Sequence, residues 1–583
     1  GADWMAGARG AADDPLGGLP VAGRPRLMMM RSVDTVGARE MFRARLMKSE
    51  EDFLGITGDS GDVVLDPEVA VGDTAMTFEN VSFSAGDKVI LKPVSGHYEP
   101  GNLVAIMGPS GSGKSTLLDI LAGKKSSPHG GTVHFNGRPR DRLFQRMSAY
   151  VAQDDILPAC LTVQEAVSFH ASLKQERPSK FTTEMFEQRI SKALEDLGLL
   201  GVKDSYIGDQ SVRGISGGQR RRVSLACAFA HFPQIMFCDE PTSGLSATDA
   251  EACVKYMRLI AHKYGITILV VIHQPRVEVT KLFDELLLLT ASPGRCVYNG
   301  PMSGLRQHCA ALGRPVPPHA NPADHIMDRI TPGNPKSCED AFVEHYDANG
   351  RPSIDVVVEQ QLHHERSSAI EVLEAQHAKL AAFGSVPKLR GSKHGVRFRR
   401  QLVLVGTRQL TLYLRDKRGI VADIMISVGK GVILGLTYLD IGDKDALAQL
   451  GFFFMLMMAT SIDGMKGIPK LITERRVMKM ETSEALYSEW AYILPFTLLS
   501  WIQAIVSNTI FIFLLFSISS LQWPMFWDVW LWTTMLYLTM DSMFLFLSAV
   551  AKDASLAMVM ALPFFMLFLL FNGFTVGRKT APR

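Results

Sequence analysis

The last third of the 583-residue chain contains five long apolar segments, which restrict the possible folds more than any other feature. They span residues 420–440, 446–463, 491–518, 525–550 and 554–574. A helix needs about 20 apolar residues to cross a bilayer. Runs such as FIFLLFSIS and LPFFMLFLLF are apolar on every helix face, which argues against helices buried in the core of a soluble domain. Residues 396–583 are therefore predicted to form an all-helical, multi-pass membrane domain.

The charges between these segments predict their orientation. Basic residues dominate before the first segment and between the second and third, whereas the loop DIGDKDA between the first and second is mostly acidic. Basic loops tend to stay on the cytosolic side of a membrane. We therefore expect an integral membrane protein with a cytosolic N-terminal half, in the plasma membrane or an internal membrane. Residues 397–415 mix basic and apolar positions and are predicted to lie along the membrane surface as a helix.

The chain before the membrane domain divides into three parts. Residues 1–66 are rich in Gly, Ala, Arg and Asp and predict a disordered tail, with an organelle transit sequence as the alternative. Residues 67–330 alternate short apolar runs with amphipathic stretches, which is typical of an α/β domain with a largely parallel sheet. Residues 331–395 are polar and predict a linker that carries a helix near 355–382.

Charge and cysteine content exclude several classes of protein. Lys and Arg exceed Asp and Glu by a formal net charge of only +2, so we expect no nucleic-acid partner. All seven cysteines fall between Cys160 and Cys338, without a CxxC pair. This spacing favours reduced thiols over a disulfide framework or a zinc site.

The segment GPSGSGKST follows the strand-like LVAIM and opens the helix-like TLLDILAG. In that context the pattern G-x-x-x-x-G-K-[ST] predicts a loop whose backbone N–H groups surround the phosphates of ATP. Lys114 is predicted to neutralise the β- and γ-phosphates, and Ser115 to place its hydroxyl on Mg²⁺. The predicted ATP-binding residues here are Gly108, Pro109, Ser110, Gly111, Ser112, Gly113, Lys114, Ser115 and Thr116.

Two adjacent carboxylates, Asp239 and Glu240, end the apolar run IMFCDE. An aspartate at the end of a buried strand is the usual Mg²⁺ partner in enzymes with this phosphate loop. A second carboxylate beside it can orient and polarise the attacking water. Two acids that merely open a solvated loop are the alternative, which the nearby phosphate loop disfavours.

The segment VRGISGGQRRRVSLA, residues 212–226, resembles the signature motif of ABC ATPases. The residues that match its core are Ser216, Gly217, Gly218 and Gln219. The resemblance implies that this motif caps the γ-phosphate of ATP held by another protomer. It also implies that Gln153 in YVAQDD contacts Mg²⁺ and the attacking water, and that His273 in VVIHQP contacts the γ-phosphate. The domain order and the segments IHQPR and NPADHIMD are similar to the G subfamily of ABC half-transporters.

This resemblance implies an α/β P-loop ABC nucleotide-binding domain fused to an all-α membrane domain, with ATP and Mg²⁺ as cofactors. It implies a homodimer or heterodimer that exports a lipid, sterol or xenobiotic by alternating access. The implied catalytic residues are Glu240, His273 and Gln153, and the implied Mg²⁺ ligands are Ser115, Gln153 and Asp239. Members of the subfamily carry six spans and a large external loop, so we expect the sixth span and that loop to be missing here.

Several questions stay open at this point. A soluble ABC ATPase and a non-hydrolysing partner subunit are the competing functions. The family turn usually reads SGLD, whereas this chain has Ser246 in place of the aspartate, either as a tolerated variant or as a weakened link between the two sites. Lys430 and Asp541 fall inside predicted spans, and we expect Asp541 to face the dimer cavity.

Overall fold

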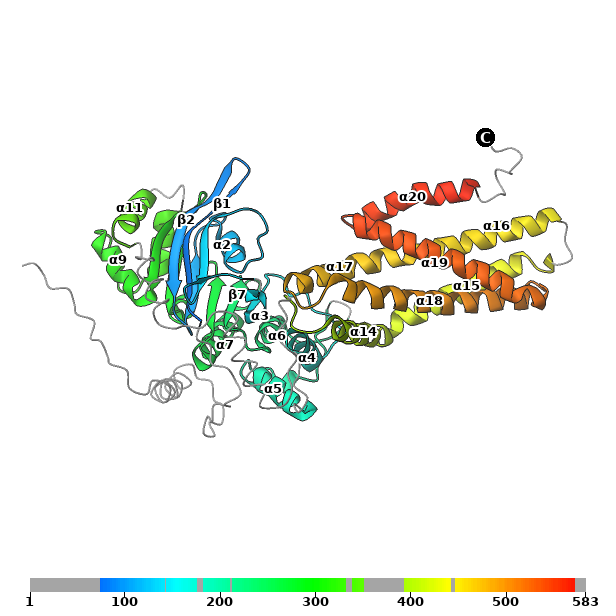
Figure 1. The fold of residues 1–583 in the computed structure, drawn as a ribbon, viewed down its shortest axis with the longest axis horizontal. Coiled ribbons are helices and arrows are strands. Elements are labelled where there is room, and N and C mark those ends of the chain that lie inside the picture. Colours follow the sequence, from blue (N-terminus) through cyan, green and yellow to red (C-terminus); the bar gives the residue numbers. More distant parts are fainter. Residues whose placement is uncertain are drawn as a thin grey trace, which may run out of the picture.

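The computed structural model describes residues 74–141, 143–175, 182–209, 212–331, 338–350, 393–441 and 446–571. The predicted N-terminal tail and the predicted linker helix near 355–382 lie outside the described residues. Figure 1 shows an α/β half at one end of the molecule and an elongated bundle of helices at the other. The predicted fold class, an α/β domain followed by an all-helical domain, is confirmed.

The main sheet of the α/β half has the order β10-β9-β3-β8-β7-β6. Its strands are β3 (Leu103–Met107), β6 (Ser148–Val151), β7 (Ile235–Asp239), β8 (Thr267–Val271), β9 (Glu285–Leu289) and β10 (Cys296–Pro301). All neighbouring pairs are parallel except β9 with β10. Every residue of β3 and β8 is buried. Such strands have helices on both faces, which explains why their sequences are continuous apolar runs.

A second, antiparallel sheet covers one side of the main sheet, with the order β2-β1-β4-β5. It comprises β1 (Met76–Ala85), β2 (Lys88–Tyr98), β4 (Gly130–Phe135) and β5 (Arg138–Pro139). The short turn between β1 and β2 contains Gly86, whose φ of 58° suits a residue without a side chain. The sequence prediction of a largely parallel sheet did not include this layer. Its apolar residues pack with those of the main sheet and the first helix in one core.

The helices of the α/β half surround the main sheet (Figure 1). They are α2 (Lys114–Leu121), α3 (Phe144–Met147), α4 (Val163–Lys174), α5 (Thr183–Glu195), α6 (Gly217–Phe229), α7 (Ala247–Tyr264), α8 (Val277–Thr280), α9 (Leu305–Ala311), α10 (Pro322–Ile330) and α11 (Glu339–His345). The second large core cluster joins β3, β7 and β8 to α4, α6 and α7. This packing holds the loops at the ends of the strands in fixed positions.

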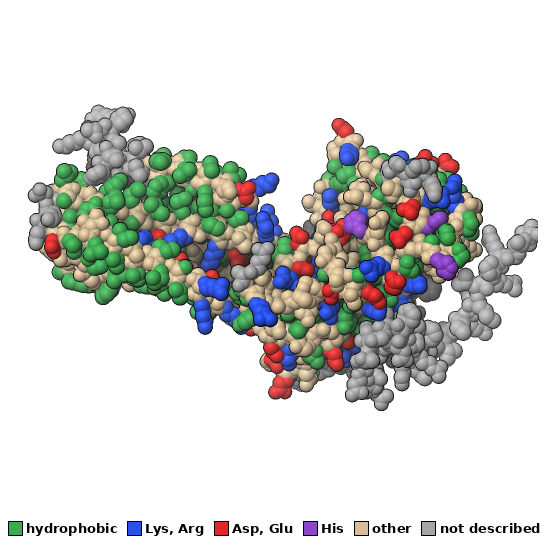
Figure 2. All heavy atoms as spheres, turned by 180° about the vertical axis from the view of Figure 1, so that it is seen from behind, with side chains coloured by type: hydrophobic (Ala, Val, Ile, Leu, Met, Phe, Trp, Pro, Cys, Tyr) green, Lys and Arg blue, Asp and Glu red, His purple; other side chains and the backbone are tan. Residues whose placement is uncertain are grey.

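The membrane half consists of long helices, and Figure 2 shows that hydrophobic side chains dominate its surface. The helices of this half are α14 (Phe398–Arg415), α15 (Lys417–Thr437), α16 (Ala446–Asp463), α17 (Gly467–Ser483), α18 (Glu489–Ile518), α19 (Phe526–Val550) and α20 (Ala554–Phe571). Within the described residues, four helical stretches are long and apolar enough to cross a membrane: Lys417–Thr437, Leu447–Ser483, Glu489–Ile518 and Trp523–Val550.

These four stretches coincide with the first four predicted spans. The fifth predicted span coincides with α20, whose described apolar stretch, Ala554–Leu567, is shorter, so a fifth crossing stays a prediction. The second stretch is longer than predicted because α16 runs through a 3-10 turn into α17. The polar residues of α17 therefore continue the helical path from the membrane to the α/β half.

The two halves meet where α4 contacts α14, side by side in Figure 1. A separate apolar cluster fills this junction and draws residues from both halves. Its members are Phe169, Leu173, Val396, Val405, Leu486, Tyr487, Ala491 and Tyr492. We call this cluster, with the polar side chains around it, the domain junction. Because residues of both halves form one apolar cluster, the two halves pack against each other in addition to being covalently connected.

Candidate nucleotide site

The phosphate loop lies between β3 and α2, as its sequence predicts. A Cβ atom at Gly108 would lie 2.6 Å from the carbonyl oxygen of Leu289, so only glycine fits there. Gly113 precedes α2 with a φ of 84°, and no side chain caps the helix. The first N–H groups of α2 are therefore available to an anion, and the helix dipole favours negative charge at this end.

Lys114 occupies the centre of this loop. Its Nζ atom donates to the carbonyl oxygens of Gly108 and Pro109, both at 2.9 Å. Burial lowers the pKa of Lys114, and the carboxylates of Glu240 and Asp239 partly oppose that shift. The ammonium group thus rests on backbone oxygens inside the loop, close to the two acids that the sequence singled out.

Ser115 and Asp239 are brought together across the sheet edge. The Ser115 Oγ atom donates to Asp239 Oδ1 at 2.9 Å. Burial raises the pKa of Asp239, and the bond from Ser115 partly offsets this effect. A hydroxyl and a carboxylate oxygen fit Mg²⁺, a hard cation that proteins hold with few side chains plus phosphate oxygens. The described residues contain no group of three or more His, Cys, Asp or Glu side chains arranged for a metal ion.

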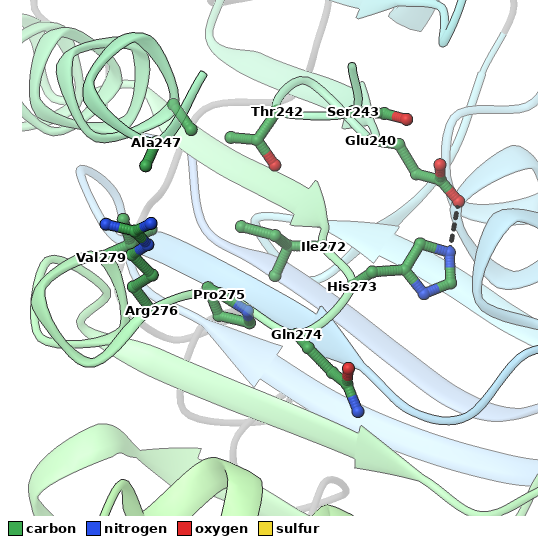
Figure 3. Close-up of a pocket in the computed structure, with 11 residues that line it drawn as sticks. Glu240, Thr242, Ser243, Ala247, Ile272, His273, Gln274, Pro275, Arg276 and Val279 are labelled. Carbon is green, nitrogen blue, oxygen red and sulfur yellow. Dashed lines mark hydrogen bonds and ion pairs between the residues drawn. The ribbon is translucent and has the colours of Figure 1, made fainter. Parts of the chain in front are cut away.

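Glu240 lies at the centre of a polar cluster one residue further on. Its Oε1 atom lies 2.7 Å from His273 Nε2, a contact drawn as a dashed line in Figure 3. Its Oε2 atom accepts a hydrogen bond of 2.8 Å from Gln153 Nε2. The backbone of Glu240 has a φ of 45°, an unusual value for a residue with a side chain. Such strain gathers at functional sites. The three predicted catalytic residues therefore form one cluster, in which Gln153 contacts Glu240 and makes no hydrogen bond to Ser115 or Asp239.

A pocket of about 220 Å³ lies beside this cluster. Figure 3 shows His273 turned toward Glu240, while Gln274 and Arg276 lie further along the same loop. Half of the His273 side chain is exposed, whereas 15% of the Glu240 side chain is. The cluster therefore sits at an open edge of the domain, accessible to a ligand that approaches from outside.

The signature segment forms the start of α6. Ser216 caps the helix in a capping box with Gln219, whose side chain accepts from the Ser216 backbone. A Cβ atom at Gly218 would lie 2.5 Å from Asp249 Cγ, so this glycine allows the close contact of α6 with α7. In the described chain, no hydrogen bond or ion pair joins Ser216, Gly217, Gly218 or Gln219 to the phosphate loop.

Ser246 has a clear local role. It caps α7, its Oγ atom accepting from the Asp249 backbone N–H at 3.2 Å and donating to Asp249 Oδ2 at 2.7 Å. Asp249 is also the residue that packs on Gly218. The serine in place of the usual aspartate therefore stabilises the contact between the signature helix and α7 and adds no charge beside Asp249.

Arg221 is not among the residues that the sequence motifs predicted for the site. It is 2% exposed, and its guanidinium donates to the carbonyl oxygens of Ala152, Gln153, Asp239 and Pro241 and to the carboxylate of Asp155. It thereby ties the loop of Gln153 to the end of β7. The sequence spacing could have indicated that Arg221 is buried, because Gly218, Arg221 and Leu225 fall on one face of α6 and all three are buried.

The domain junction contains a second arginine of this kind. Arg408 of α14 donates to both oxygens of Glu481 in α17, at 2.5 and 2.8 Å, and both side chains are buried. The Tyr487 hydroxyl also donates to Glu481. Burial lowers the pKa of Arg408, but the Glu481 carboxylate outweighs burial and raises it overall. No sequence motif pointed to this pair, whose members are 73 residues apart.

Further contacts cross the junction. Arg415 donates to both carboxylate oxygens of Glu165 in α4, at 2.6 and 2.7 Å. Lys174, at the end of α4, donates to the backbone oxygen of Glu484 at 2.7 Å. Polar contacts therefore join α4 to α14 and to the residue that ends α17.

Comparison with known proteins gives this architecture a family. The sequence matches the ABC transporter family over residues 91–243 and the ABC-2 type transporter family over residues 273–344 and 400–583. It is 32% identical over 515 residues to the broad substrate specificity ATP-binding cassette transporter ABCG2 of Bos taurus, a match that covers 85% of this chain and 77% of the relative. The chain belongs to the G family of ABC transporters.

Other matches differ in coverage. ABC transporter G family member 5 of Dictyostelium discoideum is 30% identical over 504 residues, and the match covers 85% of this chain and 32% of that relative. A solved nucleotide-free ATP-binding cassette from an ABC transporter aligns with 39% of this chain and 91% of that chain, at 23% identity and a TM-score of 0.34. As a G-family ABC transporter, the chain is a membrane protein that binds ATP and couples an ATPase to transport.

Proposed function

We propose that this G-family transporter is a dimeric half-transporter that exports a hydrophobic or amphipathic small molecule at the expense of ATP, with its ABC domain in the cytosol. The observation that carries the proposal is the cluster of Gln153, Glu240 and His273 beside the Ser115–Asp239 pair. A chain that only bound nucleotide would not need a carboxylate held between two polar partners at the edge of the phosphate site.

The phosphate loop would hold the triphosphate of ATP. Its backbone N–H groups and the start of α2 face an anion, and Lys114 supplies a positive charge at the same place. Ser115 and Asp239 would hold Mg²⁺, which neutralises developing negative charge on the phosphates. Gln153 is proposed as a third ligand through its side-chain oxygen, since the atom that contacts Glu240 is its amide nitrogen.

Glu240 is proposed as the general base for the attacking water. In the arrangement described here both of its oxygens are engaged, one by Gln153 and one by His273. Each carboxylate oxygen has two lone pairs, so Glu240 can still accept a hydrogen bond from the attacking water and take its proton. His273 is proposed to donate toward the γ-phosphate.

A second copy of the chain, or a related chain, would complete each site. The signature residues Ser216, Gly217, Gly218 and Gln219 open a helix N-terminus, which favours anions, and within the described residues no hydrogen bond or ion pair joins them to their own phosphate loop. ATP would bind between the loop of one protomer and the signature of its partner. Closure of this dimer biases the membrane domain toward one of its states, as any state-selective ligand does.

The cargo is proposed to be hydrophobic or amphipathic. The membrane half exposes apolar side chains along its helices, and the Bos taurus relative is named for broad substrate specificity. The domain junction supplies the mechanical link, because α17 reaches from the membrane stretch to Arg408 and the ABC domain. Its role in transmission is part of the proposal.

The decisive experiment measures ATP hydrolysis and transport in the same preparation. Glu240→Gln in lipid nanodiscs should lower the ATPase turnover by about 100-fold or more, the range expected for loss of a general base, while ATP still binds. Inside-out vesicles with this variant should accumulate no ATP-dependent cargo. Glu251→Gln is the matched control, since Glu251 lies on α7 and pairs only with Lys255. Equal ATPase rates for the unchanged chain and Glu240→Gln would contradict the assignment and favour a non-hydrolysing subunit.

A further inference from the structure

A cavity of about 580 Å³ lies inside the membrane half of the single chain. It is lined by the end of α14, the start of α15, the end of α16 with the first part of α17, and the middle parts of α18 and α19, so it lies in the part of the bundle nearest the ABC domain. Its volume falls within the range of about 300–1,000 Å³ that is typical of small-molecule sites. Figure 2 shows charged side chains gathered in one region of the otherwise hydrophobic membrane half.

Acidic groups predominate among the residues that line this cavity. Five carboxylates and two lysines line it: Asp416, Asp423, Asp463, Glu474, Asp541, Lys466 and Lys470. Asp463 is neutralised, because it pairs with Lys430 and, at 2.9 Å, with Lys466. The remaining lysine, Lys470, lies with its Nζ atom 5.5 Å from the centre of the Tyr413 ring.

The other four lining carboxylates form no ion pair within the described residues, and Asp541 and Asp423 lie deepest among the transmembrane helices. Lys470 attracts Asp541, and Lys466 attracts Asp423, without forming an ion pair. Asp541 is 4% exposed, and its Oδ2 atom accepts a hydrogen bond of 3.0 Å from Ser500. Its Oδ1 atom accepts none from a described residue, and the absence of a side chain at Gly467 leaves space beside it, since a Cβ atom there would lie 3.3 Å away. Asp423 accepts from the amide of Gln503 and forms no ion pair within the described chain.

A buried carboxylate without a partner charge is costly inside a membrane protein. A ligand that brings a positive charge would remove that cost, and Tyr413, Phe496 and Tyr537 supply aromatic surface in the same cavity. A bare metal ion is disfavoured, because no three acidic or histidine side chains of the described residues are arranged to hold one.

We propose that this cavity binds an amphipathic organic cation, whose charge is met by Asp541 and Asp423 and whose apolar body packs on the aromatic side chains. All of its lining residues belong to one chain, and the expectation that Asp541 faces a cavity between two protomers stays a prediction. This inference deepens the proposed export function and rests on it, because it names the class of the cargo.

The test uses two probes of the same shape and opposite charge, tetraphenylphosphonium and tetraphenylborate. The full chain is placed in phosphatidylcholine nanodiscs without ATP, and binding is measured by equilibrium dialysis, with empty nanodiscs subtracted. Tetraphenylphosphonium should bind saturably, and tetraphenylborate should only partition into lipid. Equal behaviour of the two probes, or no saturable binding of the cation, would overturn the proposal.

Variants of α19 test whether the Asp541 carboxylate binds the cation. Asp541→Asn should weaken tetraphenylphosphonium binding at least about tenfold, equivalent to ~1.4 kcal/mol, whereas Asp541→Glu keeps the charge and should remain within a few-fold of the unchanged chain. Asp528→Asn is the matched control, because it removes an exposed carboxylate from the same helix and should have no effect. If Asp541→Asn does not fold, Asp423→Asn is measured in its place. Unchanged affinity in a folded Asp541→Asn or Asp423→Asn variant would overturn the proposal.

The proposed export function and the proposed cation site are tested by different measurements. Glu240→Gln, which removes the proposed catalytic base, should bind tetraphenylphosphonium as tightly as the unchanged chain does. Absent ATP hydrolysis would therefore contradict the proposed export function, and absent cation binding would contradict the inference about the cavity.

Discussion

The nucleotide site and the domain junction are each held together by a buried arginine, but the two residues act differently. Arg221 donates mainly to backbone carbonyl oxygens of two loops within one domain. Arg408 instead pairs with a buried carboxylate on another helix. Carbonyl groups hold a loop in one shape, whereas an ion pair holds two separate helices together. We therefore expect Arg221 to maintain the geometry of the candidate nucleotide site and Arg408 to maintain the connection between the two halves.

The largest expected effect is that of Arg221→Ala. The change removes five acceptor contacts and leaves the Asp155 carboxylate without a cation and with only the Ser224 hydroxyl among its described donors, so the free energy of unfolding of the ABC domain should fall by about 3–5 kcal/mol. ATPase activity should also fall, since the backbone oxygens of Gln153 and Asp239 would no longer be held by the same side chain. Differential scanning fluorimetry and phosphate release measure the two effects. Arg222→Ala on the same helix removes two carbonyl contacts of 3.2 Å and should cost far less. Similar losses in both variants would count against a special role of Arg221.

Arg408→Ala should have the next largest effect, with a different signature. It leaves Glu481 charged and unpaired in a buried junction, a change that typically costs about 3 kcal/mol or more. ATP hydrolysis should persist while ATP-dependent transport in vesicles is lost. The double variant Arg408→Met with Glu481→Leu should recover most of the stability and leave transport impaired. Parallel loss of hydrolysis and transport in Arg408→Ala would remove the distinction drawn between the two arginines.

The junction should also respond to acid, because His170 lies within it. Burial lowers the pKa of His170 to about 4, with Glu481 opposing and Arg408 and Lys174 adding to the shift. The unfolded chain takes up this proton near the ordinary value of 6.5, so the stabilisation is present above that pH and is lost as the pH falls toward 4. At pH 5.5 the loss should be about 1.4 kcal/mol relative to pH 8. His170→Gln should flatten this part of the stability–pH curve, measured by urea unfolding; an unchanged slope would show that His170 is not the responsible group.

The smallest effect is expected at Ser246. Ser246→Ala removes the cap of α7 and the bond to Asp249, at a cost of about 1 kcal/mol. Ser246→Asp keeps a capping oxygen but places a carboxylate next to that of Asp249, so it should not exceed the stability of the unchanged chain. Its ATPase rate decides between the two interpretations of this position: a higher rate or tighter coupling to transport indicates a weakened link between sites, and no change indicates a tolerated variant.

Local motifs selected residues that the structure brings together at one sheet edge, because each motif depends on a few adjacent residues. A glycine-rich turn between a strand and a helix needs no distant partner to be recognised, and the acids at the end of β7 follow from the same pattern. The antiparallel layer was missed, since β1 pairs with both β2 and the distant β4 through register shifts that no periodicity reveals. Arg221 was missed for a related reason: its five acceptors come from loops up to 69 residues away.

The sequence by itself determined the class of each half, the order of the motifs and the position of the long apolar helices, because the phosphate loop, the signature and membrane-length segments are local patterns of residue type. Only the tertiary structure decided which charges meet. Arg408 and Glu481, or Asp541 and Ser500, lie far apart in the chain and come together only when helices pack. Whether a buried charge is paired depends on that packing, and the pairing separates a structural ion pair at the junction from an uncompensated carboxylate in a cavity.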